Sequence, residues 1–490
     1  MGIKTPRNTD RINFMKSLNQ IICLLLLLGC GGGDNSSSNI IVPLPVHSIP
    51  APNLFDQTPI RLFDAVSSYS HACHDPSFQF LLPTKINNDR YIDFIAHYWC
   101  DSITPSSFND QPTKDALVAY VSDGIGGYVI DNFGVFGEAQ AKLGGASRKF
   151  SRGDLNGDLK DDFAFAMNWE DGRAAYDFDS VITNYARPAI LLSSDSGYEV
   201  VHIGNPDWGH SVQIKENKVM FGGHSSQAFE FTDSGWVDIS NEYSNLSFAS
   251  FLTYDDYIVN SVRKNGSQGL ELLKNNNVLS SVIIQESFKV NFETWNNSGT
   301  GNYNELGVYN IRGKNYFDGM VSEMCRLDNF IVATINASKL ISGEEIIEGA
   351  FYSEIETTPV VIFAFYEVTD EALVEKNIKM VGEEIDHNFN FFDCNDVNND
   401  GRKDIVAQVF SQQWNNYDNN KGVPEIYISN NNGFYNLDTS AWPTYSFDVD
   451  SQGYLYDVDS DGHHDLVVFP LKIDISDDVE IYIANRNITN

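Results

Sequence analysis

The sequence predicts an all-β protein, and more narrowly a β-propeller of seven blades. Short apolar stretches recur along the 490 residues, and turns rich in Gly and Asn separate them, as is typical of strands. Stretches such as Ile405–Ala407 and Leu466–Phe469 are continuously apolar, which indicates strands buried on both faces. Small sheets repeated around an axis bury such strands and leave only short edges exposed. Seven repeating units can be traced, so we expect seven blades.

The first part of the chain is predicted to be a targeting segment. Residues 1–29 combine basic residues with a short apolar run, Ile21–Leu28, that is too short to span a membrane. The run ends Leu27-Leu28-Gly29-Cys30, which resembles the lipobox of bacterial lipoproteins. That resemblance implies cleavage before Cys30, lipidation of Cys30 and, because Gly31 follows, the outer membrane. The alternative is an ordinary secretory signal.

The next segment, residues 30–58, is expected to be a flexible tether. It is rich in Gly, Ser and Asn at its start and in Pro towards its end. The propeller is then assigned to residues 59–490. Its units share an Asp- or Asn-rich loop, an apolar inner strand and a later outer strand. The units begin at Ile86–Asp93, Asp154–Asp162, Ser211–Gly223, Phe251–Asn260, Cys325–Ala333, Asp396–Asp404 and Asp457–Asp465. A short helix is expected at Glu371–Met380.

Three of these loops carry oxygen side chains at positions 1, 3, 5 and 9 of a nine-residue pattern. Calcium takes six to eight oxygen ligands at roughly 2.3–2.6 Å, and a tight loop with alternating oxygens can supply them. The sequence therefore predicts calcium (Ca²⁺) sites. The predicted ligands are Asp154, Asn156, Asp158 and Asp162; Asp396, Asn398, Asp400 and Asp404; and Asp457, Asp459, Asp461 and Asp465.

These loops resemble the FG-GAP/VCBS repeat, the calcium-loop blade of integrin-α-like propellers. The resemblance implies a propeller whose calcium ions stiffen the blades, and it adds the backbone carbonyls of Lys160, Arg402 and His463 at position 7. An EF-hand is excluded because position 12 holds no Glu and a strand follows the loop. The remaining alternative is a set of metal-free polar turns, in which the packed carboxylates would repel one another.

Two positions depart from the family pattern. Leu159 stands at position 6, where Gly is usual, so that turn is expected to be strained or shaped differently. In the first unit Lys85 stands at position 1, and an ammonium cannot bind a cation. We therefore expect this loop either to lack calcium or to use Lys85 in place of its charge. The third, fourth and fifth units have lost the motif.

Four cysteines besides Cys30 follow the targeting segment. An oxidising compartment would allow them to pair. The preferred pairing is Cys73–Cys100 and Cys325–Cys394, and the alternative is four buried free thiols.

Composition and motifs exclude some classes of function but do not identify one. A net charge of −35 argues against a nucleic-acid partner. Metalloprotease, hydrolase and phosphate-binding motifs are absent from the sequence. The leading hypothesis is a non-enzymatic, lipid-anchored scaffold or adhesion protein that contacts a protein or glycan ligand through loops on one face. The alternatives are a polymer-degrading hydrolase or lyase and a periplasmic assembly factor. Oligomeric state is not predicted.

Overall fold

The structure is a computed structural model of the whole chain, and part of the chain is described. The described residues are 55–56, 59–62, 74–101, 115–139, 141–143, 147–167, 187–207, 209–247, 249–264, 267–295, 301–311, 314–340, 357–380, 384–385, 388–410, 424–437, 442–443, 451–470 and 479–485. For 284–295, 301–311, 314–320 and the ends of several strands, only the backbone is described. The targeting segment, Cys30, most of the tether and Cys73 lie outside these residues.

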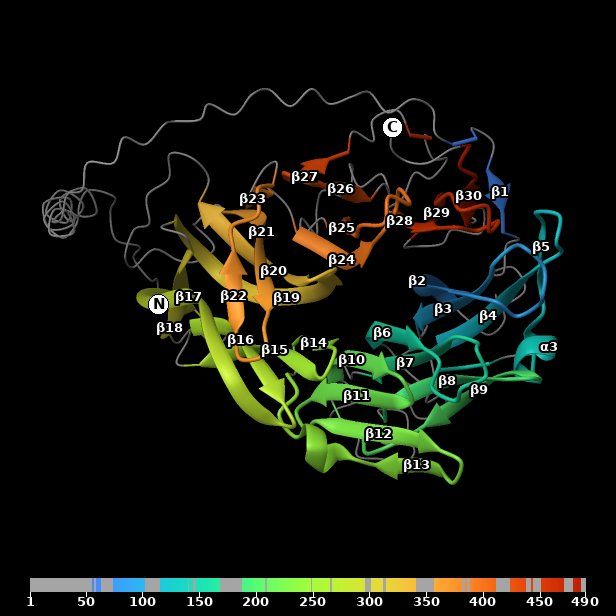
Figure 1. Cartoon of the computed structure of the whole chain (residues 1–490), viewed down its shortest axis with the longest axis horizontal. Helices are drawn as coiled ribbons and strands as arrows, with labels where there is room; N and C mark the ends of the chain where they lie inside the picture. Colours follow the sequence, from blue (N-terminus) through green and yellow to red (C-terminus); the bar gives the residue numbers. More distant parts are fainter. Residues whose placement is uncertain are drawn as a thin grey trace, which may run out of the picture. The chain divides into compact units, whose positions relative to one another are not determined.

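The predicted fold class is confirmed, because the strands of residues 49–490 form a seven-bladed β-propeller (Figure 1). Five blades are separate four-stranded antiparallel sheets. Blade 1 contains β2 (His74–Thr84), β3 (Asp93–Asp101), β4 (Asp115–Ser122) and β5 (Tyr128–Ile130). Blade 2 contains β6 (Ser147–Gly153), β7 (Asp162–Met167), β8 (Ala189–Ser194) and β9 (Gly197–His202). Blade 3 contains β10 (Gly209–Lys215), β11 (Lys218–Gly223), β12 (Gln227–Thr232) and β13 (Gly235–Asp238).

Blades 6 and 7 follow the same plan. Blade 6 contains β24 (Asn388–Asn395), β25 (Asp404–Phe410), β26 (Glu425–Asn430) and β27 (Gly433–Asn436). Blade 7 contains β28 (Ser451–Tyr456), β29 (Asp465–Pro470) and β30 (Glu480–Tyr482). Its fourth strand is β1 (Ile60–Arg61), from the start of the propeller, with Ile60 paired to Ile481. The two ends of the propeller are therefore joined in one sheet, which closes the ring.

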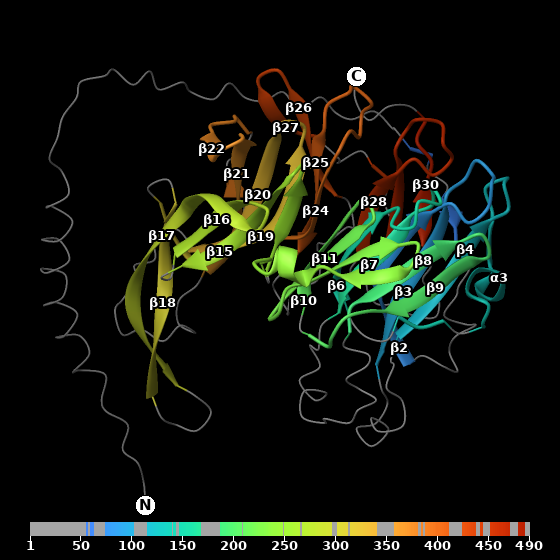
Figure 2. The same cartoon turned by 60° about the horizontal axis from the view of Figure 1, so that its bottom comes forward.

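Blades 4 and 5 are fused into one continuous sheet, which the sequence did not predict. Blade 4 contains β14 (Phe251–Tyr254), β15 (Tyr257–Lys264), β16 (Ser267–Lys274) and the first part of β17 (Asn277–Trp295). Blade 5 contains the second part of β19 (Lys314–Leu327), then β20 (Phe330–Leu340), β21 (Thr357–Val368) and β22 (Leu373–Lys376). The rest of β17 pairs with β18 (Gly301–Ile311), which pairs with β19, and β23 (Glu384–Ile385) pairs with β21. Figure 2 shows the β17–β18 ribbon extending from the two blades.

Apolar side chains fill the space between every pair of neighbouring blades. Seven separate clusters of buried residues join blades 1–2, 2–3, 3–4, 4–5, 5–6, 6–7 and 7–1. Across the closure, for example, Phe94 of β3 shares a cluster with Val467 of β29. Because each second strand packs against both neighbours, its residues are apolar on both faces, as in β7, where every residue is buried.

Two expectations about individual elements are corrected. The segment Glu371–Met380 forms no helix; it contains strand β22, which completes blade 5 because its residues pair with Tyr366 and Glu367 of β21. The apolar strand after each loop is the second strand of its blade, and the first strand is innermost. The described helices are α3 (Asn132–Phe136) and the 3₁₀ helix η3 (Ser240–Tyr243). Within the described residues no helix combines the length and apolarity needed to cross a membrane.

Candidate calcium loops and the central channel

All three predicted calcium loops occupy the same place in their blades. Each begins directly after the first strand, and its ninth residue is the first residue of the second strand. The residue before the loop pairs with that ninth residue, as Gly153 pairs with Asp162 and Tyr456 with Asp465. The first loop, from Lys85 to Asp93, has the same position in blade 1. The four loops therefore lie on one face of the propeller.

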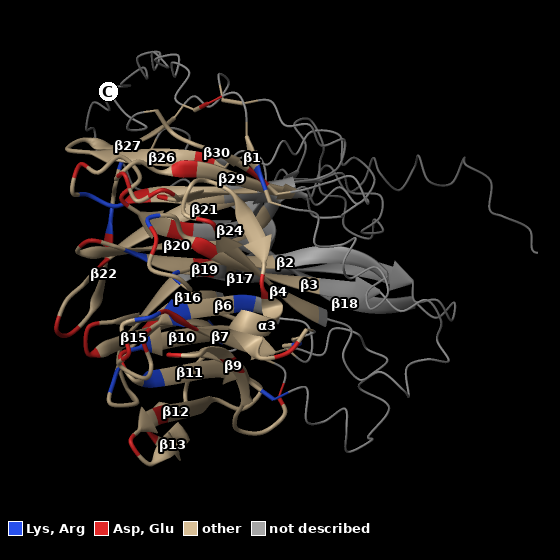
Figure 3. Ribbon diagram, turned by 90° about the vertical axis from the view of Figure 1, so that its right-hand side faces the viewer, with Lys and Arg blue, Asp and Glu red and all other residues tan. Residues whose placement is uncertain are grey.

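Blades 3, 4 and 5 lack the motif because a two-residue turn replaces the long loop. The turns are Glu216-Asn217, Asp255-Asp256 and Asp328-Asn329, each between the first and second strands. Figure 3 shows many of the acidic residues at turns on one side of the propeller.

The backbone of the three loops is alike. Positions 4 and 6 both have positive φ: Gly157 and Leu159 in the second blade, Asn399 and Gly401 in the sixth, and Ser460 and Gly462 in the seventh. Leu159, at φ 67° and 93% exposed, therefore keeps the loop's shape in a conformation that is strained for a residue with a Cβ atom. Of the two outcomes expected for this turn, a different shape is not seen, and the left-handed leucine agrees with the strained one.

Side-chain oxygens at positions 1 and 5 of all three loops, and at position 3 of the loops in blades 2 and 6, accept from backbone N–H groups of their own loop. Asp154 Oδ1 accepts from the Gly157 N–H at 2.7 Å, and Asp396 Oδ2 accepts from the Gly401 N–H at 2.8 Å. In the same way Asp457 Oδ1 accepts from the Asp461 N–H at 2.9 Å. In the seventh loop, oxygens of Asp457, Asp459 and Asp465 lie within 4.8 Å of one another. Such convergence of carboxylates suits a divalent cation.

The carboxylate at position 9 has a structural role as well. Asp404 and Asp465 have no exposed surface. One oxygen of Asp404 accepts from the Val397 N–H at 3.2 Å and the other from the Ser429 N–H at 2.8 Å, on the third strand of the blade. Asp93, Asp162 and Asp465 make the corresponding bonds. Position 9 thus ties the loop to the blade.

Burial makes a negative charge at position 9 unfavourable without a cation. It raises the pKa of Asp404 and of Asp465 to about 7, and it also raises the pKa of Asp93 and of Asp162, while the backbone N–H bonds oppose the shift. A nearby cation would stabilise the ionised carboxylates.

Lys85 supplies a positive charge in the first loop. Its ammonium donates to the carbonyl oxygens of Asp89, Arg90 and Tyr91 at 3.3, 3.0 and 3.3 Å. It also donates to Ser460 Oγ in the seventh loop at 3.2 Å. The geometry favours the second of the two expectations for this loop, in which Lys85 substitutes for the ion.

The loops of blades 6, 7 and 1 are in contact. The Asn399 amide donates to the Gly462 carbonyl, and Ser460 Oγ donates to the Arg90 carbonyl at 2.6 Å. The Ile92 N–H donates to the Val458 carbonyl at 2.7 Å. An ion in one loop would therefore affect its neighbours, including the closure between blades 7 and 1.

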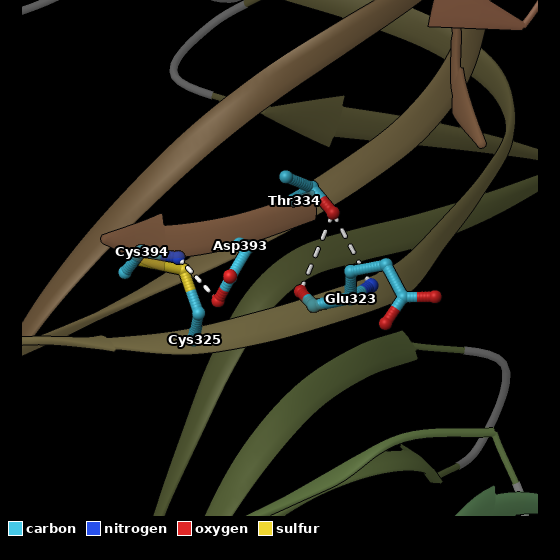
Figure 4. Close-up of a disulfide and its surroundings, with 5 residues drawn as sticks. All are labelled: Glu323, Cys325, Thr334, Asp393 and Cys394. Carbon is cyan, nitrogen blue, oxygen red and sulfur yellow. Dashed lines mark hydrogen bonds between the residues drawn. A yellow bond between two sulfur atoms is a disulfide. The ribbon is translucent and has the colours of Figure 1, made fainter. Parts of the chain in front are cut away.

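A central channel runs through the propeller. Its cavity of about 460 Å³ is lined by the first strand of every blade. The predicted Cys325–Cys394 disulfide is present and links the first strands of blades 5 and 6 at this channel (Figure 4). Cys73, of the other predicted pair, lies outside the described residues.

Two carboxylates line the channel beside the disulfide. Glu323 forms an ion pair with Lys149 at 2.9 Å, and Asp393 accepts from the Cys394 N–H at 2.8 Å. The Asp393 side chain faces the open channel, but protein surrounds it, and this burial raises its pKa. No histidine occurs among the described residues that line the channel.

Comparisons with known proteins add no functional assignment. No protein-family model matches the sequence, and no curated protein is similar to it. A computationally designed protein, Ika8, matches with a TM-score of 0.38 and 8% identity over 87% of this chain and 99% of its own. The β-propeller domain of the Trilobed protease from Pyrococcus furiosus matches with a TM-score of 0.35 and 9% identity, over 84% and 96%. The lignostilbene dioxygenase of Pseudomonas brassicacearum matches with a TM-score of 0.27 and 11% identity, over 90% and 94%. At such TM-scores the propeller assignment rests on the strand topology described above.

Proposed function

We propose that the chain is a calcium-stabilised, lipid-anchored binding or scaffold protein of the bacterial cell envelope, and that it contacts a protein or glycan ligand through one face of the propeller. The observation that carries the proposal is the shared geometry of three loops. In each, side-chain oxygens turn inwards over two left-handed residues. The FG-GAP/VCBS resemblance is part of this proposal.

Electrostatics support a structural role for calcium. Each loop concentrates carboxylates within nine residues, and one of them is buried. Without a cation, their mutual repulsion would favour opening of the loop. With one, the loop would be fixed to its own blade through position 9 and to its neighbours through Asn399 and Ser460.

Calcium titration of the full-length protein in detergent tests this role. Calorimetry should give three sites, and a chelator should lower the melting temperature markedly. Absence of calcium binding, with an unchanged melting temperature, would remove the metal from the proposal.

The anchor is tested separately. A Cys30→Ser variant should move from the membrane fraction to the soluble fraction after cell lysis, because lipidation requires the thiol. Unchanged membrane association would contradict the anchor. A protein that carries a calcium-stabilised, acidic set of loops on such an anchor is suited to contacts within the cell envelope.

A second candidate is a hydrolase or lyase for an extracellular polymer, and the carboxylates of Glu323 and Asp393 in the central channel favour it. An Asp393→Asn variant separates the two functions. If the protein releases fragments from envelope or plant polysaccharides and this variant abolishes the release, the enzyme is supported. Retained ligand binding with no release by either protein supports the binding function.

A further inference from the structure

A second cavity lies on the side of the propeller where blades 3 and 4 meet. Its volume is about 510 Å³, within the range of about 300–1,000 Å³ typical of small-ligand sites. It is lined by η3 and lies beside three tight turns, β10–β11, β14–β15 and β16–β17. The last two turns contribute lining residues, and Lys215 lines the cavity at the end of β10, where the first turn begins. Two of these turns stand where blades 1, 2, 6 and 7 have nine-residue loops. The shortened connections therefore leave this space open.

The floor of the cavity is apolar. Met220, Leu246 and Leu273 are buried there and belong to the packing of blades 3 and 4. Half-buried Tyr243 and Ile258 complete the apolar surface. Such a floor can accept the C–H face of a sugar ring, and a tyrosine presents both an apolar ring and a hydroxyl group.

The rim is formed largely by side-chain amides. Five asparagines from two separate elements line the cavity: Asn241, Asn245, Asn275, Asn276 and Asn277. Each carboxamide has two N–H donors and one acceptor oxygen. The amides of Asn245, Asn276 and Asn277 each donate once within the protein, which leaves their other N–H and their oxygen for a ligand. Sugar hydroxyl groups also donate and accept, so amides match them without a charge. The exposed carboxylates of Glu242 and Asp256 add acceptors.

The charge of the site disfavours an acidic ligand. Lys215 is the one cation among the described lining residues, and its ammonium donates to the Asp255 carbonyl. The chain as a whole carries −35, which repels polyanions.

We propose that this cavity binds a neutral oligosaccharide. The inference rests on the proposed binding function and names its ligand class and site. Rim amides and the two carboxylates would hydrogen-bond the hydroxyl groups, while Tyr243 and the apolar floor would contact the ring faces.

The test uses the calcium-loaded full-length protein and calorimetric titration with cellohexaose, chitohexaose, mannohexaose, xylohexaose and maltohexaose, with an oligogalacturonate as the acidic probe. At least one neutral hexasaccharide should bind, and the oligogalacturonate should not. Asn241→Ala/Asp256→Ala should weaken binding at least tenfold, because the double variant removes hydrogen-bonding groups from the rim. Both side chains are exposed, so their removal should not disturb the fold. Asn432→Ala removes a surface amide in the β26–β27 turn of blade 6, outside the lining of this cavity, and as the control it should leave binding unchanged.

Melting temperatures of both variants should equal that of the parent protein. Binding of a neutral hexasaccharide that the double variant does not weaken would overturn the site while leaving the binding function intact. Failure of all five neutral hexasaccharides, or preference for the oligogalacturonate, would overturn the ligand class. Capture of a defined peptide that the double variant abolishes would also overturn it, because the cavity would then be a protein site.

Discussion

The ammonium of Lys85 lies 3.3 Å from the carbonyl oxygen of Tyr91, the position-7 carbonyl that an ion would use in the other loops. The same ammonium bonds two further carbonyls of its own loop. Asn88 and Arg90, at positions 4 and 6 of this loop, are absent from the described residues with positive φ, unlike their counterparts in the other three loops. The first loop, which holds the Lys85 ammonium, therefore differs in backbone conformation from the three predicted calcium loops.

Lys85→Asp is expected to create an additional calcium site. The variant would place carboxylates at positions 1, 5 and 9 and an amide at position 3, as in the second loop. The number of calcium sites measured by calorimetric titration should rise from three in the parent protein to four in the variant.

The control for this prediction is Lys85→Met, which removes the ammonium and adds no ligand. It should destabilise the protein without changing the calcium stoichiometry. A Lys85→Asp protein that still binds three ions would show that the first loop cannot adopt the calcium-binding shape.

Alanine substitutions at Asp404 and at Asp396 are expected to lower the unfolding free energy by different amounts when calcium is removed. Asp404→Ala leaves the buried N–H groups of Val397 and Ser429 without their acceptor, which should cost about 3 kcal/mol even in chelator. Asp396→Ala removes a carboxylate that accepts from exposed N–H groups, so its loss should cost about 1 kcal/mol or less in chelator.

Urea unfolding with calcium and with chelator measures both effects. In calcium, Asp396→Ala should lose the stabilisation that ion binding gives the parent protein. Equal losses for the two variants in chelator would contradict a separate bracing role for position 9.

The number and order of the blades could be predicted, because each blade is marked by residue types that lie close together in the sequence. In blades 2, 6 and 7, Asp and Asn at alternate positions mark the loop between the first and second strands, and the apolar run that follows marks the second strand. All seven units predicted from the sequence correspond to blades. Apolar runs alone could not show which strand was innermost, because the second strand is buried by its neighbours on both sides.

Features that depend on distant pairing were not predictable. The short strand Ile60–Arg61 is recognisable only through its partner at Glu480–Tyr482. The β17–β18 ribbon replaces an ordinary loop between blades 4 and 5, and it is defined by the pairing of its two strands with each other and with β19. The helix expected at Glu371–Met380 failed because pairing with β21 overrides local helix propensity.

The strain at Leu159 can be measured directly. Leu159→Gly should stabilise the protein by about 1 kcal/mol, because Gly adopts positive φ without the penalty that a Cβ atom brings. The reverse change, Gly401→Leu, falls at the same position of the sixth loop, where an added Cβ atom would meet no neighbouring atom. It should destabilise by a similar amount.

Denaturant unfolding in saturating calcium compares the two substitutions. Because neither makes or removes a packing contact, opposite changes of similar size would identify backbone strain as the cause. A neutral Leu159→Gly would mean that the exposed leucine side chain contributes a compensating interaction.

The Cys325–Cys394 disulfide is expected to stabilise the ring between blades 5 and 6. It joins cysteines separated by 69 residues, and loop-closure entropy for a segment of that length gives at most roughly 4 kcal/mol. Apolar packing already holds these blades together, with Val332, Phe363 and Ile405 in one buried cluster, so the ring should survive without the bond.

The Cys325→Ala/Cys394→Ala variant should therefore fold, with an unfolding free energy lowered by about 2–4 kcal/mol in urea. The parent protein in reductant should show at least this loss. Any further loss when the variant itself is treated with reductant would report the second predicted pair, Cys73–Cys100. Equal stability of the parent and the variant under oxidising conditions would contradict a stabilising role for this bond.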